Sequence, residues 1–291
     1  MTWRCSGLGW PPGARMAVLR WEGGRVSPLT SGKAMGFRAE GRRRCLGARG
    51  NDCPLGSVVL GRATQARCPE CARLEQAYSV AADTLPDDPR TYRVYLAWFG
   101  PGMVKVGITA EDRGPARLLE QGAVVFSWLG RGPLMAARRT EELLRSALGI
   151  PDRIPYADKR AVRSELPGPV ERAAEIEALH RRALALGAWA ETLEPLEFEP
   201  VDHTEVFGLG RLTAAASVVR ELIGGGTVAG TLVAVAGPDL HLWTAEDRLV
   251  VFDTRLMTGW SLVGADPASG VTVPTADVSA SSGGAVQDGL F

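Results

Sequence analysis

Residues 92–117 read YRVYLAWFGPGMVKVGITAEDRGPAR, and their pattern decides the fold of the middle of the chain. Apolar residues alternate on both sides of a Gly-Pro-Gly breaker, which predicts a β-hairpin over 92–109. A turn centred on the proline places Tyr95 opposite Gly107, with Lys105 on the diagonal. Because Gly107 has no side chain, we expect a ligand to approach this face of the hairpin closely.

The hairpin is followed by a predicted third strand over 123–129 and a predicted helix over 133–148. On that helix Glu141 shares a face with apolar residues such as Leu144, so its carboxylate is expected to point towards the domain interior. An inward carboxylate is costly unless it is paired or bound to a metal. Glu141 is therefore a candidate metal ligand, with Glu142 as an alternative that we expect to face solvent.

This order of hairpin, arginine and inward glutamate resembles the core of the GIY-YIG nuclease superfamily. Arg93-Val94-Tyr95 looks like the first signature tripeptide and keeps its tyrosine. Lys105-Val106-Gly107 looks like the second and keeps the glycine, but lysine stands where the family has tyrosine. The resemblance implies an α+β fold with a GIY-YIG-like small sheet and flanking helices.

The resemblance also implies metal-dependent phosphodiester cleavage in nucleic acid, with DNA favoured over RNA. Tyr95 would activate or position a water, and Glu141 would hold Mg²⁺. Arg117 would stabilise the negative charge on phosphorus, with Arg113 as a rival for that role. Lys105 can donate to phosphate, but an ammonium is no base near neutral pH unless its pKa is strongly lowered. Two alternatives stay open: a catalytically inactive nucleic-acid-binding protein, and a scaffold for a protein partner.

Four cysteines in the N-terminal third predict a metal site. Cys45, Cys53, Cys68 and Cys71 include one Cys-x-x-Cys pair, and tetrahedral zinc takes four thiolates. With four protein ligands such a zinc would be structural and would leave no position for a substrate. A redox pair or unliganded thiols are the alternative. Cys5 is expected to be an incidental thiol.

The whole order further resembles an uncharacterised bacterial family in which a four-cysteine segment precedes a KVGIT-like core. Two later signatures complete the resemblance, Gln121-Gly122-Ala123 and the segment FDTRLMTGW at 252–260. It covers roughly residues 40 to 265 and names no reaction.

Composition and turn signals divide the chain into four expected parts. They are an N-terminal zinc-stapled β segment (1–91), the GIY-YIG-like core (92–169), a helix with a C-terminal β-rich unit (170–264) and a Gly/Ser/Ala-rich disordered tail (265–291). A helix at 70–82 is predicted to follow the cysteines.

Charge is unevenly distributed although the net charge is zero. Residues 1–91 hold 14 Lys/Arg and 8 Asp/Glu, and residues 92–150 hold 8 and 5, whereas the remainder holds 11 and 20. A basic first half permits a phosphate-attracting surface, although ordinary solvated charge is the simpler interpretation. Arg42, Arg43 and Arg44 are the best local case for phosphate contact.

No apolar run approaches the ~20 residues that span a bilayer, and the N-terminus lacks the apolar stretch of a signal peptide. We therefore expect a cytoplasmic protein with no membrane partner. The three histidines, His180, His203 and His241, have no metal-ligand spacing and are expected to be ordinary surface or core residues. Trp98 and Trp128 are expected to pack in a core rather than to stack on bases.

Overall fold

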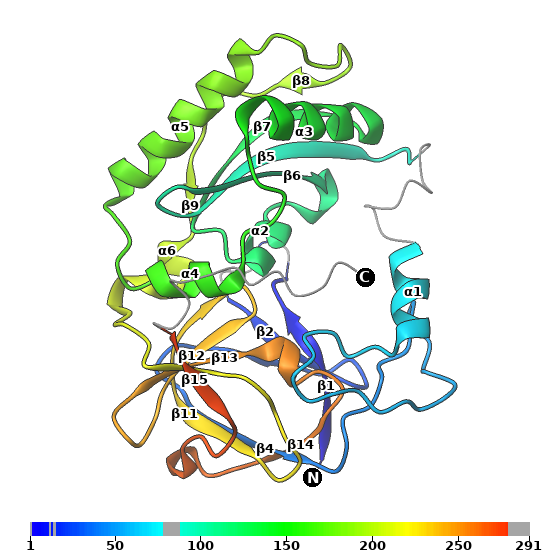
Figure 1. Cartoon of the computed structure of the whole chain (residues 1–291), viewed down its shortest axis with the longest axis vertical. Coiled ribbons are helices and arrows are strands. Elements are labelled where there is room, and N and C mark those ends of the chain that lie inside the picture. The colour runs from blue at the N-terminus through cyan, green and yellow to red at the C-terminus, as the bar shows by residue number, and fades with distance from the viewer. Residues whose placement is uncertain (1, 12, 14–15, 78–87, 279–291) are drawn as a thin grey trace.

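The structure is a computed structural model that describes residues 2–11, 13, 16–77 and 88–278. It contains two sheets, one of ten strands and one of five, which form the two lobes in Figure 1. Helix α4 (Tyr156–Val162) lies between them. The fold is therefore a mixed α+β one, rich in strands, as the sequence predicted. In the described residues no helix is long and apolar enough to cross a membrane.

The five-stranded sheet contains the predicted hairpin. Its order is β6-β5-β7-β8, and β9 also pairs with β7. The strands are β5 (Thr91–Gly100), β6 (Met103–Ala110), β7 (Val125–Pro133), β8 (Glu194–Pro195) and β9 (Val201–Asp202). The hairpin and the third strand are confirmed within a few residues of their predicted bounds.

Alternation along β5 sends its side chains into two apolar clusters. Val94, Leu96 and Trp98 pack with α3 (Leu134–Leu148) and α5 (Pro169–Ala185). Tyr95 and its alternate neighbours pack instead with Leu118 of α2 (Ala116–Gln121). Both sides of β5 are thus covered, and Lys105 lies on the edge strand β6 of the sheet.

The ten-stranded sheet combines both ends of the chain. Its order is β15-β10-β13-β12-β11-β4-β14-β1-β2-β3. The strands are β1 (Trp3–Gly9), β2 (Val18–Trp21), β3 (Val26–Pro28), β4 (Ala34–Glu40), β10 (Ser217–Val219), β11 (Thr227–Ala236), β12 (Asp239–Trp243), β13 (Leu249–Asp253), β14 (Ser261–Gly264) and β15 (Thr275–Asp277).

This sheet differs from the expected division into successive units. The N-terminal strand β4 lies between β11 and β14 and pairs with both, so the ends expected to be separate share one hydrogen-bonded ladder. The five-stranded lobe likewise recruits α5, β8 and β9 from beyond residue 169. Residues 265–278, expected to be disordered, contain β15, which covers the edge of β10. The rest of that predicted tail, 279–291, lies outside the described residues.

The remaining helices are short. Helix α1 (Pro69–Ala77) begins in the Cys-x-x-Cys pair, as predicted, while the predicted continuation over 78–82 lies outside the described residues. Helix α6 (Thr204–Phe207) follows β9. Trp98 is fully buried and Trp128 is half-buried against Tyr95 and Phe126, so both tryptophans pack in the protein as expected.

Candidate functional site

The hairpin forms the floor of a cleft of about 660 Å³. Tyr95 pairs with Gly107 across the β5–β6 ladder, which is the predicted register. A Cβ atom on Gly107 would lie 2.4 Å from the Tyr95 hydroxyl oxygen, so the tyrosine ring occupies the space that the glycine leaves free. The Gln121 side-chain amide donates a hydrogen bond of 2.9 Å to that hydroxyl.

Burial raises the pKa of Tyr95, although Gln121 and Arg117 favour its ionised form. The phenol therefore stays neutral near pH 7 and keeps its proton. It can donate a hydrogen bond to a ligand, but it cannot serve as a phenolate base.

Lys105 and Glu141 are half-buried charged groups that both line the cleft. Within the described residues, neither side chain takes part in a hydrogen bond or in an ion pair shorter than 4.0 Å. Burial and the neighbouring Arg117 guanidinium lower the pKa of Lys105, and burial raises the pKa of Glu141. Each charge is therefore partly desolvated and compensated only at longer range, by the other and by Asp152 or Arg145, an arrangement found at ligand sites and in structural charge networks alike.

Helix geometry explains why Glu141 reaches the cleft. Ala137 and Leu144, one turn away on either side, are fully buried against the sheet, and Glu141 shares their side of α3. Glu142 is the more exposed of the two glutamates and pairs with Arg145 at 3.2 Å. The prediction that Glu141 rather than Glu142 faces inward is confirmed.

Arg117 and Arg113 both line the cleft, but they differ in their partners. Arg113 donates hydrogen bonds of 2.9 and 2.8 Å to Glu120. Arg117 is exposed and pairs with no carboxylate of the described residues. The cleft lining as a whole holds six Lys/Arg and three Asp/Glu, which makes it a positive surface.

A magnesium ion would find one inward carboxylate in this cleft. Mg²⁺ commonly binds one or two protein carboxylates and completes its shell with water and substrate phosphate oxygens, so Glu141 suits that role. In the part of the chain that the structure describes, no cluster of three carboxylates or histidines that could hold a metal occurs.

The four predicted cysteines converge into a second site. The Sγ atoms of Cys45, Cys53, Cys68 and Cys71 all lie within 4.8 Å of one another, and the Cys53–Cys68 pair is 3.9 Å apart. Sulfurs bound tetrahedrally at about 2.3 Å lie roughly 3.8 Å apart, so this group can hold a metal ion such as zinc. The backbone N–H groups of Gly47 and Cys68 donate to the Cys45 sulfur at 3.3 and 3.2 Å, as donors around metal thiolates do.

Cys5 and the three histidines lie outside both sites and are structural residues. Cys5 is fully buried in the ten-stranded lobe, and burial raises its pKa to about 12, so it is an inert thiol. The three histidines are all buried away from the cleft. His203, for example, lies 2.9 Å through Nδ1 from the Ala123 carbonyl oxygen.

The expected phosphate contact by Arg43 is wrong. Its side chain is buried and donates to the carbonyl oxygens of Leu60, Ala63, Arg255 and Thr258, at 2.6 to 2.8 Å, and more weakly to the Thr258 hydroxyl. A guanidinium has five N–H donors in a fixed plane, and these five contacts use them. Arg43 therefore joins the cysteine segment to the loop after β13, while Arg42 and Arg44 remain exposed.

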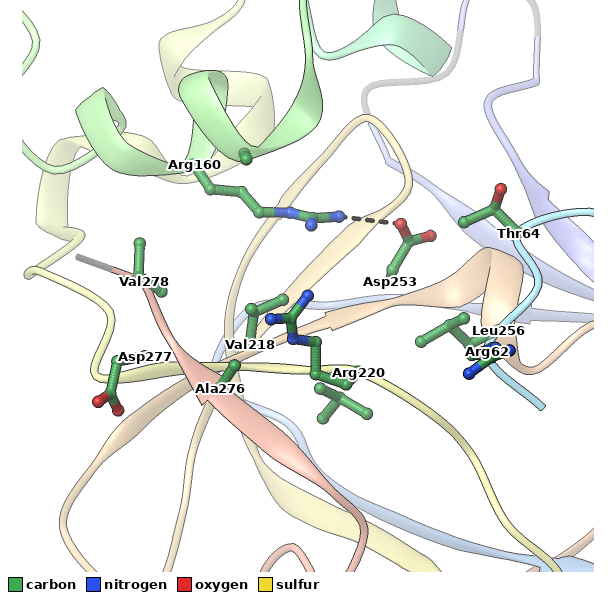
Figure 2. A pocket seen from close by; sticks show the side chains of 12 residues that line it. Arg62, Thr64, Arg160, Val218, Arg220, Asp253, Leu256, Ala276, Asp277 and Val278 are labelled. Carbon is green, nitrogen blue, oxygen red and sulfur yellow. Dashed lines mark hydrogen bonds and ion pairs between the residues drawn. The ribbon is translucent and has the colours of Figure 1, made fainter. Parts of the chain in front are cut away.

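The two lobes are connected by a cluster of charged residues that sequence reasoning missed, and we call this cluster and the segments around it the joint. Asp239 is fully buried and accepts hydrogen bonds from Arg160 (2.6 and 3.0 Å) and Arg163 (2.5 Å). Arg160 also reaches Asp253 at 2.9 Å. Figure 2 shows this contact beside a pocket of about 240 Å³ into which Arg160 and Arg220 point.

The two signature segments meet at this joint. Asp253 belongs to the FDTRLMTGW segment, and Gly122 of the Gln-Gly-Ala signature lies against Gly237 in the turn between β11 and β12. Both glycines have positive φ, and a Cβ on Gly237 would lie 2.9 Å from the Gly122 nitrogen. The signal for the joint was therefore present in the two signatures, but nothing in either one names Arg160 or Asp239 as its partner.

Comparison with known proteins identifies a family. The sequence model of a family described as "Protein of unknown function (DUF2797)" matches residues 32–262. That span includes the cysteine cluster, the cleft and most of the joint. Neither the curated proteins nor the solved structures contain a match to the chain.

Proposed function

We propose a nucleic-acid-processing function for this chain, which belongs to the DUF2797 family of proteins of unknown function. In this proposal the five-stranded lobe is a GIY-YIG-like core, and its cleft binds the phosphodiester backbone. The reaction is hydrolysis of a phosphodiester with one divalent cation held at Glu141.

One observation carries the proposal. Lys105 and Glu141 are partly desolvated and attract each other electrostatically, but neither has a bonded partner among the described residues. They line the same positive cleft as Arg117 and Tyr95. A phosphate would neutralise the lysine and the arginine, and a cation would neutralise the glutamate. A phosphodiester with its metal therefore supplies the directly bonded counter-charges that both side chains lack among the described residues.

Each side chain then has one task. Arg117, an exposed residue that lines the cleft, pairs with a phosphate oxygen and stabilises charge that develops on phosphorus. Lys105 adds a second positive contact. Tyr95, a neutral phenol held by Gln121, donates to the phosphate or to the attacking water and orients it. Bound Mg²⁺ would supply Lewis-acid activation of the phosphate, and Glu141 is the residue that would hold it.

Binding without cleavage is the second candidate, and a specific observation favours it. Lys105 stands in the position where the resemblance has a second tyrosine, and its ammonium donates to phosphate without activating water. A chain with this substitution keeps the affinity of the cleft for phosphate and loses one polar group of the reaction.

Incubation with labelled branched, single-stranded and duplex DNA in the presence of Mg²⁺ separates these candidates. Cleavage by the wild type that disappears in Glu141→Gln and in Tyr95→Phe supports the nuclease. Glu177→Gln, an exposed glutamate of α5, is the matched control and should cleave normally. Cleavage that persists in both site variants refutes the assignment. Binding without any cleavage supports the second candidate, and the absence of both leaves a partner-binding scaffold.

The cysteine cluster is proposed to hold a structural zinc ion. Four thiolates complete a tetrahedral shell, so the metal would have no open position for a substrate. Its contribution is then to order a segment that has few strands of its own. Metal analysis of protein purified without added zinc tests this, because a zinc content well below one per chain would exclude the site.

A further inference from the structure

We propose that Lys105 is a nucleophile that forms an imine with the aldehyde of a phosphorylated deoxyribose, as it occurs at an abasic position in nucleic acid. The inference rests on the proposed function, because the cleft must first bind the phosphates on either side of the sugar. It adds a covalent reaction that needs no metal.

Geometry distinguishes Lys105 from the other amines. The chain has only three lysines, Lys33, Lys105 and Lys159. Lys33 is exposed in a turn of the ten-stranded lobe before β4. Lys105 alone lines the cleft, half-buried and without a bonded partner among the described residues.

Lys159 shows why titration alone does not select the nucleophile. Burial lowers its pKa to about 7. Its side chain nevertheless donates to the Gln121 carbonyl oxygen at 3.1 Å and lies 3.7 Å from the Phe99 ring centre and 4.5 Å from that of Tyr156. Because it is enclosed on these sides and only 5% exposed, no sugar can reach it.

The surroundings of Lys105 suit an imine-forming amine. A lysine becomes nucleophilic near neutral pH when it is desolvated and lies beside another cation. Lys105 meets both conditions, because burial and the Arg117 guanidinium both lower its pKa. The cleft volume of about 660 Å³ lies within the usual range for small-ligand sites.

Each step balances with water and with groups that line the cleft. The Lys105 ammonium gives a proton to water, and its free lone pair attacks C1′ of the open-chain sugar to give a carbinolamine. The carbinolamine hydroxyl, to which Tyr95 donates a hydrogen bond, takes back that proton from water and leaves as water, and a protonated C=N bond forms. Glu141, which lines the same cleft, can next accept the C2′ proton and later returns it to water. The C3′–O bond breaks with its electron pair on the phosphate, and hydrolysis of the imine restores the lysine.

Borohydride trapping tests the proposal directly, since reduction converts the imine into a stable amine that mass spectrometry can locate. The probes are an oligonucleotide with one abasic site, the intact oligonucleotide, and free deoxyribose 5-phosphate, all in EDTA. We expect an adduct on Lys105 with the abasic oligonucleotide. It should be abolished in Lys105→Arg, which keeps the positive charge but cannot form an imine, and be unchanged in Lys33→Arg.

Binding of the intact oligonucleotide is measured in parallel. If wild type and Lys105→Arg both bind it and no adduct forms, the imine proposal is refuted while the proposed function survives. If no oligonucleotide binds, the proposed function fails. In that case, an adduct of Lys105 with deoxyribose 5-phosphate would support Lys105 as a nucleophile whose substrate is a small-molecule aldehyde. No adduct would refute both the proposed function and the imine proposal. An adduct on Lys33, Lys159 or the N-terminus would also refute the imine proposal.

Discussion

Replacing Gly107 by alanine should destabilise the protein through one defined contact. The new Cβ atom would lie 2.4 Å from Oη, 2.5 Å from Cζ and 3.0 Å from Cε2 of Tyr95, all far inside van der Waals contact. Tyr95 is only 2% exposed and packs against Phe126 and Trp128, so its ring cannot move away freely. Gly107 has no positive φ, so the alanine backbone itself is unstrained. Overpacking of this kind costs about 1–3 kcal/mol.

Urea unfolding followed by tryptophan fluorescence measures this cost. With an m-value of about 3 kcal/mol/M, the midpoint should fall by roughly 0.3–1 M. Gly264→Ala is the matched control, because Gly264 also lies in a strand, has no positive φ and has no atom within 4 Å of the position that the added methyl would take. Its midpoint should stay or rise, since alanine loses less entropy than glycine on folding.

A double-mutant cycle separates the clash from any other effect. In a Tyr95→Ala background the three clashing atoms are absent, so adding Gly107→Ala should cost nothing or stabilise the fold slightly. If Gly107→Ala costs the same free energy in both backgrounds, the contact with the tyrosine ring is not its cause and the reasoning is refuted.

Three further predictions concern the joint and the cysteine segment. Asp239→Asn should lower the free energy of unfolding by about 3–5 kcal/mol, because it leaves Arg160 and Arg163 facing a neutral group in a buried site. Burial alone would raise the pKa of Asp239, but the two arginines outweigh it and the net shift is downwards. This carboxylate therefore contributes stability above about pH 4, and that contribution is lost as the pH falls further. In a pH series, the urea midpoint of Asp239→Asn should therefore fall less on acidification than that of the wild type. Arg43→Lys should melt at a lower temperature than the wild type, because an ammonium has three donors for the five acceptors around it. An unchanged Tm would show that the Arg43 guanidinium does not hold the cysteine segment to the loop after β13. Cys71→Ser should lower both the bound zinc and the Tm, whereas Cys5→Ser should leave the zinc content at the wild-type value.

Local patterns were enough to find the hairpin and the side of α3 that faces the sheet. The pairing of Tyr95 with Gly107 follows from the position of a single turn, because strand register is set by the residue on which the turn is centred. Glu141 follows from helical periodicity alone. The cysteine cluster follows from ligand type and count, since thiolates of one segment tend to converge on one metal.

Side-chain partners over long separations were not accessible in this way. Arg43 looked like a surface cation in a run of three arginines, and only the packing of residues 60–63 and 255–258 around it shows that it is enclosed. The sequence of β4 likewise does not indicate that this strand lies between β11 and β14. A strand carries no local signal for its partners, because backbone hydrogen bonds are the same for every residue pair.

The sequence by itself therefore determined the elements of the cleft, the facing of their side chains and the set of cysteines that could hold a metal. These depend on periodicities of two or 3.6 residues and on ligand chemistry. Only the tertiary structure decided which charges are compensated. Arg113 pairs with Glu120, whereas Arg160 and Arg163 both pair with Asp239. Lys105 and Glu141 line the cleft without bonded partners among the described residues. That difference arises from distances between segments far apart in the chain, and it separates residues bonded within the fold from those that the proposed function assigns to a ligand.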